Sequence, residues 1–347
     1  MSHSGGTERV LSVIANGLSD RGYPVTVVSL WGDGRTFFPM GRQVKVRWIK
    51  RECPKAGIPG RLKFLCSVLR KADARILVDV DMILGCYSLF MKWRIPGLYW
   101  ISWEHFYYDF PFERYRLVRK AVRRLAGRYA DRLVVLTRAD RQVYAGRMAL
   151  KNRIVCIHDP APFDTGYEKE EETPMIFGAG RLTKVKGFDM LLKSWKLLEE
   201  KYPRWTMVIA GCGEEREALE KQAGDLGLKR LTFAGNVPDI EAYYQKAAFF
   251  VLPSRNEGFG MALLEAMCFG LPAVCYACRM GPKEIVEDQK TGFLVEPGDI
   301  SAFAGKMEVL MRDMELRRQM GQAAARSAGR FEREKILDKW ESLISGR

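Results

Sequence analysis

Two glutamates lie on either side of a glycine-rich turn in the segment Glu257-Gly-Phe-Gly-Met-Ala-Leu-Leu-Glu265. Gly258 and Gly260 allow the backbone to approach a ligand closely, because neither carries a Cβ atom. Residues 261–269 are predicted to form a short helix, and the free N–H groups at its start favour anions. A carboxylate beside a phosphate site usually receives hydroxyl groups, so the pattern favours a nucleotide sugar as ligand. The alternative is a capped helix with two exposed acids.

A second, basic element follows an apolar run at residues 175–177 and precedes a helical pattern, in the segment Gly178-Ala-Gly180-Arg181-Leu-Thr-Lys-Val-Lys186. This order predicts a strand, a loop and a helix. Arg181 offers a planar fork for phosphate oxygens and Lys186 a compact charge. Together they could neutralise a diphosphate leaving group. A solvated turn with two ordinary basic residues is the alternative.

The net charge of +14 is unevenly distributed, because residues 1–165 hold 29 Lys and Arg against 14 Asp and Glu. The basic residues are densest in a predicted amphipathic helix at 114–132, where apolar side chains recur at helical spacing. Such a helix binds an anionic membrane surface or simply presents a solvated face. We do not expect nucleic acid as a partner, since no recognition module accompanies these charges, although salt-dependent DNA binding would revive that interpretation.

The size of the chain, 347 residues with 47% hydrophobic composition, exceeds what one hydrophobic core usually holds. No apolar run approaches the roughly 18 to 20 residues that span a bilayer, and no signal peptide is evident, so we expect a cytoplasmic protein. Cys275 and Cys278 form a lone C-x-x-C, and the chain has 3 histidines. A zinc site would need a second pair or nearby histidines, so we expect no metal.

Apolar runs and helical patterns alternate along the chain, which predicts an α/β protein with two doubly wound domains. The expected domains are residues 1–165 together with 331–347, and residues 166–330, with an acidic linker at 167–174. Only Met1-Ser-His-Ser precedes the first glycine turn, so the first strand of the N-terminal domain is apparently missing. The predicted strands are 25–30, 44–49, 75–80, 97–102, 132–136, 175–177, 206–210, 231–234, 249–252, 273–276 and 292–295.

The chain resembles the retaining GT4-type glycosyltransferases of the GT-B fold, which include enzymes of bacterial polysaccharide, lipopolysaccharide and glycolipid biosynthesis. The resemblance extends from Gly5-Gly-Thr-Glu-Arg9 to the last helix, and the segment from Glu257 to Glu265 is its most specific part. It implies two Rossmann-like domains facing across a cleft, with the acceptor on the N-terminal one and the donor on the C-terminal one. It also implies that the last helix crosses back to the first domain, and that an apolar strand leads into the glycine pair, as after a truncation or a misassigned start.

The resemblance also assigns roles to single residues. Glu257 would hold hydroxyls of the transferred sugar, Glu265 the ribose hydroxyls, and His105 would position the donor sugar near the reacting carbon. A purely structural neutral histidine is the alternative for His105, and Glu104 and Tyr107 would face the acceptor. The other donor-binding positions are Gly5, Gly6, Gly180, Arg181, Lys186, Val237 at the base, Gly258, Phe259, Gly260 and Met261.

The predicted reaction is retaining transfer of a hexosyl group from a UDP- or GDP-linked sugar to a sugar hydroxyl of a glycan or lipid-linked acceptor. Arg181, Lys186 and the helix start before Met261 would stabilise the leaving diphosphate without metal or other cofactor. Two alternatives stay open: a GT-B nucleotide-sugar epimerase, and an inactive or truncated binding partner in a glycan-assembly complex. Two departures from the family pattern are Asp159, where asparagine is frequent, and Ala277, where aspartate is frequent.

Overall fold

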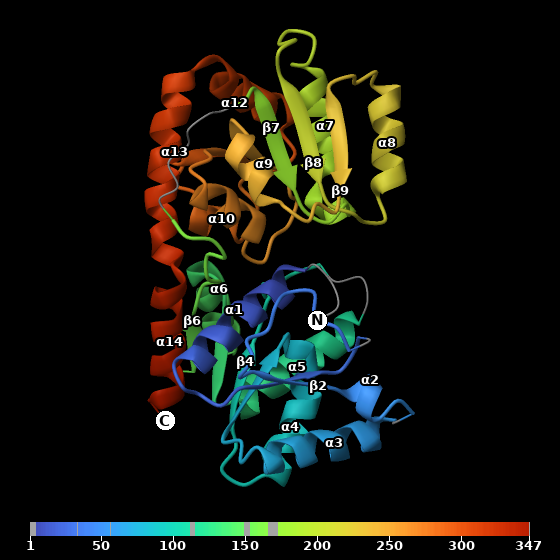
Figure 1. The fold of residues 1–347 in the computed structure, drawn as a ribbon, viewed down its shortest axis with the longest axis vertical. Helices are drawn as coiled ribbons and strands as arrows, with labels where there is room; N and C mark the ends of the chain where they lie inside the picture. Colours follow the sequence, from blue (N-terminus) through green and yellow to red (C-terminus); the bar gives the residue numbers. More distant parts are fainter. Residues whose placement is uncertain are drawn as a thin grey trace. The chain divides into compact units, whose positions relative to one another are not determined.

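The computed structural model describes residues 5–32, 34–55, 57–111, 115–148, 153–165 and 173–346. The chain divides into two compact units, and each is described here by itself. Unit 1 consists of Met1–Pro162 and Arg333–Arg347, and unit 2 of Phe163–Glu332. Both are built from parallel strands joined by helices, so the predicted α/β architecture with two Rossmann-like domains is confirmed (Figure 1).

Unit 2 contains a six-stranded parallel sheet in the order β12-β11-β10-β7-β8-β9. The chain starts in the middle of this sheet at β7, builds outward through β8 and β9, and then returns to the other side of β7 with β10. The point where the order reverses therefore lies between β7 and β10, which pair directly through Phe249 and Ile176. The strands are β7 Met175–Ala179, β8 Thr206–Ala210, β9 Leu231–Gly235, β10 Phe249–Leu252, β11 Ala273–Tyr276 and β12 Gly292–Val295.

Helices cover both faces of the unit 2 sheet, which agrees with strands that are apolar on both sides. One face packs against α7, α8, α12 and α13 through a core that includes Trp195, Phe249 and Phe303. On the other face, the ring of Phe177 contacts Tyr243 and Tyr244 of α9. The helices are α7 Phe188–Lys196, α8 Arg216–Asp225, α9 Glu241–Lys246, α10 Met261–Cys268, α11 Pro282–Ile285, α12 Ile300–Arg312 and α13 Met314–Ala328, with 3-10 turns η2 Lys184–Lys186 and η3 Gly329–Phe331.

Unit 1 contains two separate parallel sheets among its described residues, a pair β1-β2 and a four-stranded sheet β3-β4-β5-β6. The buried side chains of Trp100, Leu133 and Tyr144 belong to the core on one face of the larger sheet. Strand β6 is absent from the sequence predictions, because three residues give too short a pattern to recognise. The strands are β1 Thr26–Ser29, β2 Lys45–Trp48, β3 Ile76–Val80, β4 Tyr99–Trp103, β5 Arg132–Val135 and β6 Ile154–Cys156. The missing first strand stays a prediction.

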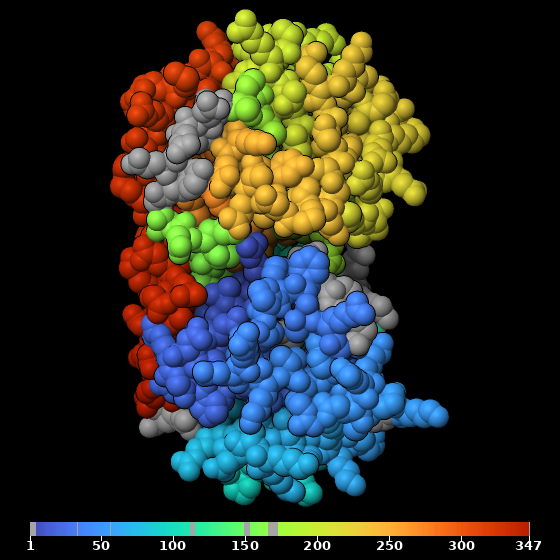
Figure 2. All heavy atoms as spheres, viewed as in Figure 1, coloured from blue at the N-terminus to red at the C-terminus, as the bar shows by residue number. Residues whose placement is uncertain are grey.

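The last helix, α14, belongs to unit 1, as the resemblance implies for the C-terminal segment. It packs against α1, and Trp340 of α14 contacts Trp103 of β4 at 4.7 Å between ring centroids. Figure 2 shows that the N-terminal segment, in blue, forms most of the surface of unit 1 on the face drawn. The helices are α1 Gly6–Asp20, α2 Ile49–Glu52, α3 Ile58–Lys71, α4 Gly85–Arg94, α5 Arg116–Tyr129, α6 Arg138–Met148 and α14 Arg333–Ser345, with the 3-10 turn η1 Met82–Leu84.

Candidate functional site

The loops that follow β7 and β10 meet at the reversal point of the unit 2 sheet, where doubly wound folds place their ligands. The loop after β7 carries Lys186 and the loop after β10 carries Glu257. The Lys186 Nζ atom donates a hydrogen bond of 2.6 Å to Oε1 of Glu257. Two residues singled out from separate motifs are thus in direct contact.

Only one of the two carboxylate oxygens of Glu257 is hydrogen-bonded within the described residues. Its Oε1 atom also accepts a hydrogen bond of 2.6 Å from the Ser254 hydroxyl, and the residue is 6% exposed. Within the described part of the chain, Oε2 of Glu257 has no hydrogen-bond partner. A carboxylate with one oxygen fixed and the other available is suited to accept a hydroxyl group from a ligand.

A second ion pair fixes the two loops to each other. The Arg255 guanidinium donates to both carboxylate oxygens of Asp189, at 2.6 and 2.7 Å, in a bidentate pair. Arg255 also donates from its side chain to the Lys184 carbonyl at 2.8 Å and from its backbone to the Val185 carbonyl at 2.8 Å. Arg255, two residues before Glu257, therefore positions the backbone segment that carries Lys186.

Glycines at two positions allow neighbouring segments of the backbone to pack closely against the loop that carries Glu257. A Cβ atom on Gly187, which has φ +68°, would lie 2.0 Å from the Pro253 carbonyl oxygen. A Cβ atom on Gly281, which has φ +81°, would lie 2.3 Å from the Phe259 carbonyl oxygen. Neither position tolerates a side chain without movement of the loop that carries Glu257.

Helix α10 begins at Met261, and Gly260 is its N-cap with φ 111°. Glu257 therefore precedes the helix, so it shares no helical face with Glu265. Gly258 and Phe259 lie in the turn, and the Phe259 ring is buried against Phe331 at 5.5 Å. The first N–H groups of α10 have no intrahelical acceptor and face the end of the turn, which is the geometry that favours anions.

Arg181 and Gly180 lie in a loop that packs against the glycine segment after β8. The Gly180 N–H donates to the Ala210 carbonyl, and a Cβ on Gly211 would lie 1.9 Å from the Gly180 carbonyl oxygen. The Arg181 side chain is exposed, and no ion pair of its guanidinium occurs within the described residues. Gly211 therefore allows a close contact between the two backbones, and Arg181 is left accessible to a ligand.

Glu265 lies on α10 and is buried, at 6% exposure. Its Oε2 atom accepts a hydrogen bond of 2.9 Å from the Tyr244 hydroxyl of α9. Val237 is half-buried in the segment between β9 and α9. Unit 2 thus carries each of the predicted donor-binding residues from Gly180 to Glu265 at or near the loops that follow β7, β9 and β10. Their contacts with a donor stay predictions.

His105 follows β4 in unit 1 and is buried, at 6% exposure. Burial lowers its pKa to about 4, so the imidazole is neutral near pH 7. Its ring lies 4.5 Å from that of Trp103, and its Nε2 atom has no hydrogen-bond partner within the described residues. A neutral ring with an unpaired nitrogen can bind a hydroxyl group, which agrees with a positioning role.

The neighbouring Glu104 is also buried, and burial raises its pKa to about 8. Its carboxyl lies 3.6 Å from the Arg123 guanidinium, and it accepts hydrogen bonds from the Phe106 N–H at 3.1 Å and the Tyr144 hydroxyl at 3.4 Å. These contacts direct Glu104 into the core of unit 1, and Tyr107 is buried as well, at 5% exposure. Both are therefore less accessible to an acceptor than the sequence interpretation assumed.

Gly5 and Gly6 form the start of α1, with Gly5 as N-cap in an extended conformation. A Cβ atom added to Gly5 would lie 2.3 Å from Oε2 of the Glu8 side chain. The predicted approach of these two residues to a diphosphate is not tested by the structure.

Among the described residues, no group of three or more His, Cys, Asp or Glu side chains could hold a metal ion. Cys275 and Cys278 are buried free thiols, and burial raises the pKa of Cys278 to about 12. Such thiols are protonated at neutral pH and poorly reactive. Independence of metal stays a prediction.

The basic helix predicted at 114–132 corresponds to α5, Arg116–Tyr129, followed by β5 from Arg132; Arg114 lies outside the described residues. Leu117 is 76% exposed and Val118 is 48% exposed, so apolar side chains accompany the basic face. None of the helices in the described ranges is both long and apolar enough to cross a membrane.

Sequence reasoning missed the residues that hold the predicted ones in place. Ser254 lies only three residues before Glu257, and this proximity in the sequence is the one local hint of their contact, since the segment is not helical and the helix-capping pattern does not apply. No comparable signal exists for Arg255 with Asp189, or for Tyr244 with Glu265, because each pair joins distant parts of the chain.

Comparison with known proteins agrees with this geometry. The family described as "Glycosyl transferases group 1" matches residues 163–327, and "Glycosyltransferase Family 4" matches residues 4–162. A relative from Haemophilus influenzae, called "Uncharacterized glycosyltransferase", is 32% identical and covers 98% of this chain and 96% of its own length. A relative from Campylobacter jejuni is 29% identical over 99% of this chain and 96% of its own length. Its name is "GalNAc-alpha-(1->4)-GalNAc-alpha-(1->3)-diNAcBac-PP-undecaprenol alpha-1,4-N-acetyl-D-galactosaminyltransferase".

Among solved structures, the fold is similar to that of Anabaena HepE in complex with UDP-glucose, with a TM-score of 0.81 and 20% identity. That alignment covers 100% of this chain and 98% of the Anabaena chain. The two domains and the site at the strand reversal thus define a GT-B glycosyltransferase. The chain belongs to the GT4-type family of glycosyltransferases. Its bacterial relatives include enzymes of polysaccharide and glycolipid biosynthesis.

Proposed function

We propose that this glycosyltransferase moves a hexosyl group from a UDP- or GDP-linked sugar to a hydroxyl of a glycan or lipid-linked acceptor, with retention at the anomeric carbon and without metal. The observation that carries the proposal is the contact of Lys186 with Glu257 at the reversal point of the unit 2 sheet, beside the start of α10. This arrangement puts a cation, a hydroxyl acceptor and a helix N-terminus in one place.

The leaving diphosphate needs positive charge as the bond to the sugar breaks. Lys186 and the first N–H groups of α10 lie at one end of the sheet reversal, and Arg181 adds an exposed guanidinium on the loop after β7. These groups supply the electrostatic stabilisation that a divalent cation would otherwise give. Because Lys186 is already paired with Glu257, its charge is held in position before the donor binds.

The sugar and the nucleoside would lie on either side of this charge. The free oxygen of Glu257 accepts a hydroxyl of the hexosyl group, and Glu265 accepts a ribose hydroxyl in exchange for its bond with Tyr244. Val237 contacts the base through its backbone. His105 positions the sugar as a neutral hydrogen-bonding group, because its low pKa removes it as a cationic acid near pH 7.

The donor and acceptor classes are supported by relatives. The structural neighbour from Anabaena binds UDP and glucose, which favours a UDP-linked donor over a GDP-linked one. The Campylobacter relative is named for an undecaprenol-diphosphate-linked glycan. We extend that acceptor class to this chain, which would act on a lipid-linked glycan at the cytoplasmic side of the membrane.

Helix α5 would bring the enzyme to such an acceptor. Lys120, Arg124 and Arg128 supply charges for anionic headgroups, each worth about 1 kcal/mol near the surface, while Leu117 and Val118 insert. Flotation with vesicles that contain phosphatidylglycerol should retain the protein, whereas phosphatidylcholine alone should not. Leu117→Gln should weaken retention, and Met314→Gln, a change at another exposed apolar residue, in unit 2, should not.

The reaction is tested by thermal shift with UDP- and GDP-sugars, with and without EDTA, followed by analysis of the product's anomeric configuration by NMR. A ligand that binds only the folded state must stabilise it. Stabilisation by one donor that persists in EDTA and weakens in Glu265→Ala supports the proposal. An inverted product would refute retention. A 2-epimer of the donor sugar formed without an acceptor would indicate the epimerase, and no donor binding by a folded protein would indicate an inactive partner in glycan assembly.

A further inference from the structure

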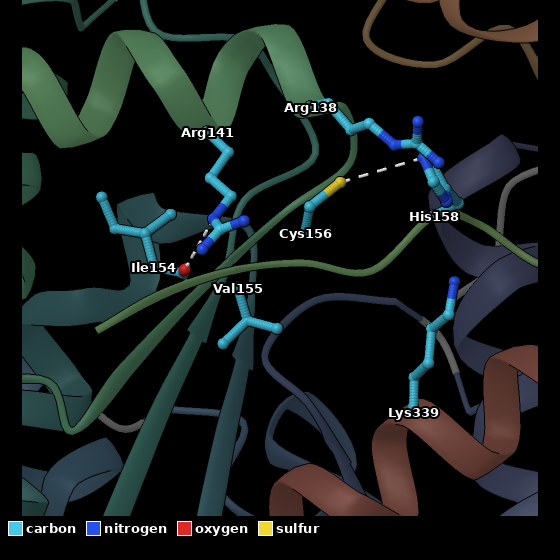
Figure 3. A pocket seen from close by; sticks show the side chains of 7 residues that line it. All are labelled: Arg138, Arg141, Ile154, Val155, Cys156, His158 and Lys339. Atoms are coloured by element: carbon cyan, nitrogen blue, oxygen red, sulfur yellow. Dashed lines mark hydrogen bonds between the residues drawn. The ribbon is translucent and has the colours of Figure 1, made fainter. Parts of the chain in front are cut away.

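Two arginines outside the contacts assigned to the donor differ in what lies around them. In unit 1, Arg141 lines a cavity of about 490 Å³, and its Nε–H donates to the Ile154 carbonyl at 3.2 Å (Figure 3). The residues described around that cavity are not among those assigned to the donor. In unit 2, Arg216 is the first residue of α8, and its guanidinium reaches the end of β9, just before the segment assigned to the base. This second arginine is therefore placed to act on a bound nucleotide.

Two of its guanidinium nitrogens hold Arg216 in place. The Nε–H donates to Oε1 of Glu220, one turn later on α8, at 2.7 Å, and Nη2 donates to the Phe233 carbonyl of β9 at 3.3 Å. The third nitrogen, Nη1, has no hydrogen-bond partner within the part of the chain that the structure describes. It lies against the backbone of Gly235, where an added Cβ atom would be 3.3 Å away. The side chain is thus fixed and still offers unused donors at the end of β9.

The backbone that follows β9 also has unused groups. The pairing of β8 with β9 shifts register between Ile209 and Ala210, and β9 ends at Gly235 with φ +69°. Such bulges redirect a strand and are frequent beside active sites. Among the described residues, neither the N–H nor the C=O of Val237 has a hydrogen-bond partner. Two residues span at most about 7 Å, so one flat base can contact both the Val237 backbone and the donors of Arg216.

We infer that Arg216 selects the base of the donor, by donating a hydrogen bond from Nη1 to the carbonyl oxygen at position 4 of uracil. The inference rests on the proposed function, in which Val237 contacts the base through its backbone. A guanidinium has donors only, so it requires an acceptor on the base. Uracil presents a carbonyl oxygen at position 4, as thymine does, whereas cytosine presents an amino group, which is a donor. Arg216 therefore favours uridine donors and excludes cytidine donors.

A pair with Glu220 alone does not account for the position of Arg216. On the same helix, Lys221 and Asp225 form a pair with the same spacing of four residues, at 2.7 Å. The Lys221 side chain is 78% exposed, whereas that of Arg216 is 36% exposed, because the guanidinium also contacts the end of β9. Exposed pairs of this kind contribute little to stability. The Lys221 pair therefore provides a matched control for the loss of the Arg216 pair.

The experiment titrates UDP and CDP into the full chain by calorimetry. The two nucleotides share the ribose and the diphosphate and differ only at positions 3 and 4 of the base. The parent protein should bind UDP at least about tenfold more tightly than CDP, because a site built to hydrogen-bond one group rejects an analogue that lacks it. Arg216→Met, which has no donor, should bind UDP about tenfold more weakly than the parent and CDP no more weakly.

A third nucleotide, 4-thio-UDP, isolates the contact at position 4. It keeps the N–H at position 3 and replaces only the oxygen at position 4 by sulfur, which is a weaker acceptor. The parent should bind 4-thio-UDP more weakly than UDP, and Arg216→Met should bind the two alike. Arg216→Gln gives a second comparison if Arg216→Met does not fold. Its amide can donate to an oxygen or accept from an amino group, so it should also lose the preference for UDP over CDP.

Two control variants separate the base from the rest of the nucleotide. Lys221→Met removes a pair of the same spacing from α8 and should leave both affinities within about twofold of the parent. Glu265→Ala should weaken UDP and CDP equally, since the ribose is common to both.

Equal weakening of UDP and CDP in the Arg216 variants would place the guanidinium at the diphosphate, and an unchanged preference would leave it with a purely structural contact. Either result would overturn the inference and leave the proposed glycosyltransferase function standing. A folded parent that binds GDP but not UDP would overturn only the assignment of uracil. A folded parent that binds no nucleotide would refute the proposed function as well.

Discussion

Lys186 and Glu257 are 71 residues apart in the chain, and their side chains meet at 2.6 Å where the strand order of unit 2 reverses. The contact arises because β7 and β10 are direct neighbours, so the loops that follow them share one edge of the sheet. Glu257 is almost fully buried, and Lys186 is about one-quarter exposed. A ligand phosphate can therefore reach the ammonium without the carboxylate leaving its place.

Replacement of Lys186 by alanine should lower turnover of the preferred donor about a hundredfold, because a positioned cation is removed from the leaving group. It should also destabilise unit 2 by about 1 to 3 kcal/mol, since a buried carboxylate loses one of its two donors. Steady-state kinetics and urea unfolding would measure the two effects. Lys184→Ala, an exposed change on the same 3-10 turn, should leave turnover within about twofold. Equal losses in both variants would contradict the assigned role.

Much of this site could be predicted from local patterns. Glycine and proline positions around Glu257 indicate a turn before a helix, and apolar runs place β7 and β10 within two residues of their observed bounds. The contacts between loops could not be predicted, because Arg255 and Asp189 are 66 residues apart and no spacing rule links them. The same holds for burial of Glu104, which depends on Arg123 and Tyr144 from two later helices.

Glu265 should discriminate between donors with and without ribose hydroxyls. In the parent protein, 2′-deoxy-UDP or 3′-deoxy-UDP should bind about tenfold more weakly than UDP, because a hydrogen bond to a charged group is worth about 1.5 to 3 kcal/mol. In Glu265→Ala the deoxy nucleotide and UDP should bind alike. Calorimetric titration of each pair measures this. Tyr244→Phe, which removes the phenol that donates to Glu265 at 2.9 Å, should retain the discrimination. Persistent discrimination in Glu265→Ala would exclude the ribose contact.

Gly187 should be far less tolerant of alanine than Gly227. Both have nearly the same backbone conformation, φ +68° and φ +67°, so the cost of a left-handed alanine is common to both. Only at Gly187 would the Cβ lie 2.0 Å from the Pro253 carbonyl oxygen, whereas at Gly227 nothing lies within 4 Å. Gly227→Ala should cost about 1 kcal/mol, and Gly187→Ala at least about 2 kcal/mol more, with loss of donor binding. Similar unfolding midpoints for the two variants would show that the loop moves freely.

Unit 1 should lose stability as pH rises, because it buries several carboxyls whose pKa values are raised. Burial raises the pKa of Asp159 to about 8 and that of Asp79 to about 7. The folded chain keeps protons that the unfolded chain releases near pH 4, so the stabilisation is complete below pH 4 and is lost progressively up to about pH 8. Asp159 is 3% exposed, and its Oδ1 atom has no partner within the described residues.

Asp159→Asn should remove part of this pH dependence, since the amide has nearly the same shape and carries no charge at any pH. At pH 8 the variant should melt at least about 3 °C above the parent, because each kcal/mol shifts the midpoint by about 2 to 4 °C in a unit of this size. At pH 4 the two should melt together. Asp20→Asn, at an exposed position at the end of α1, should follow the parent at both pH values. A variant that melts below the parent at pH 8 would show that Asp159 is ionised and paired there, which would reverse the assigned direction of its pKa.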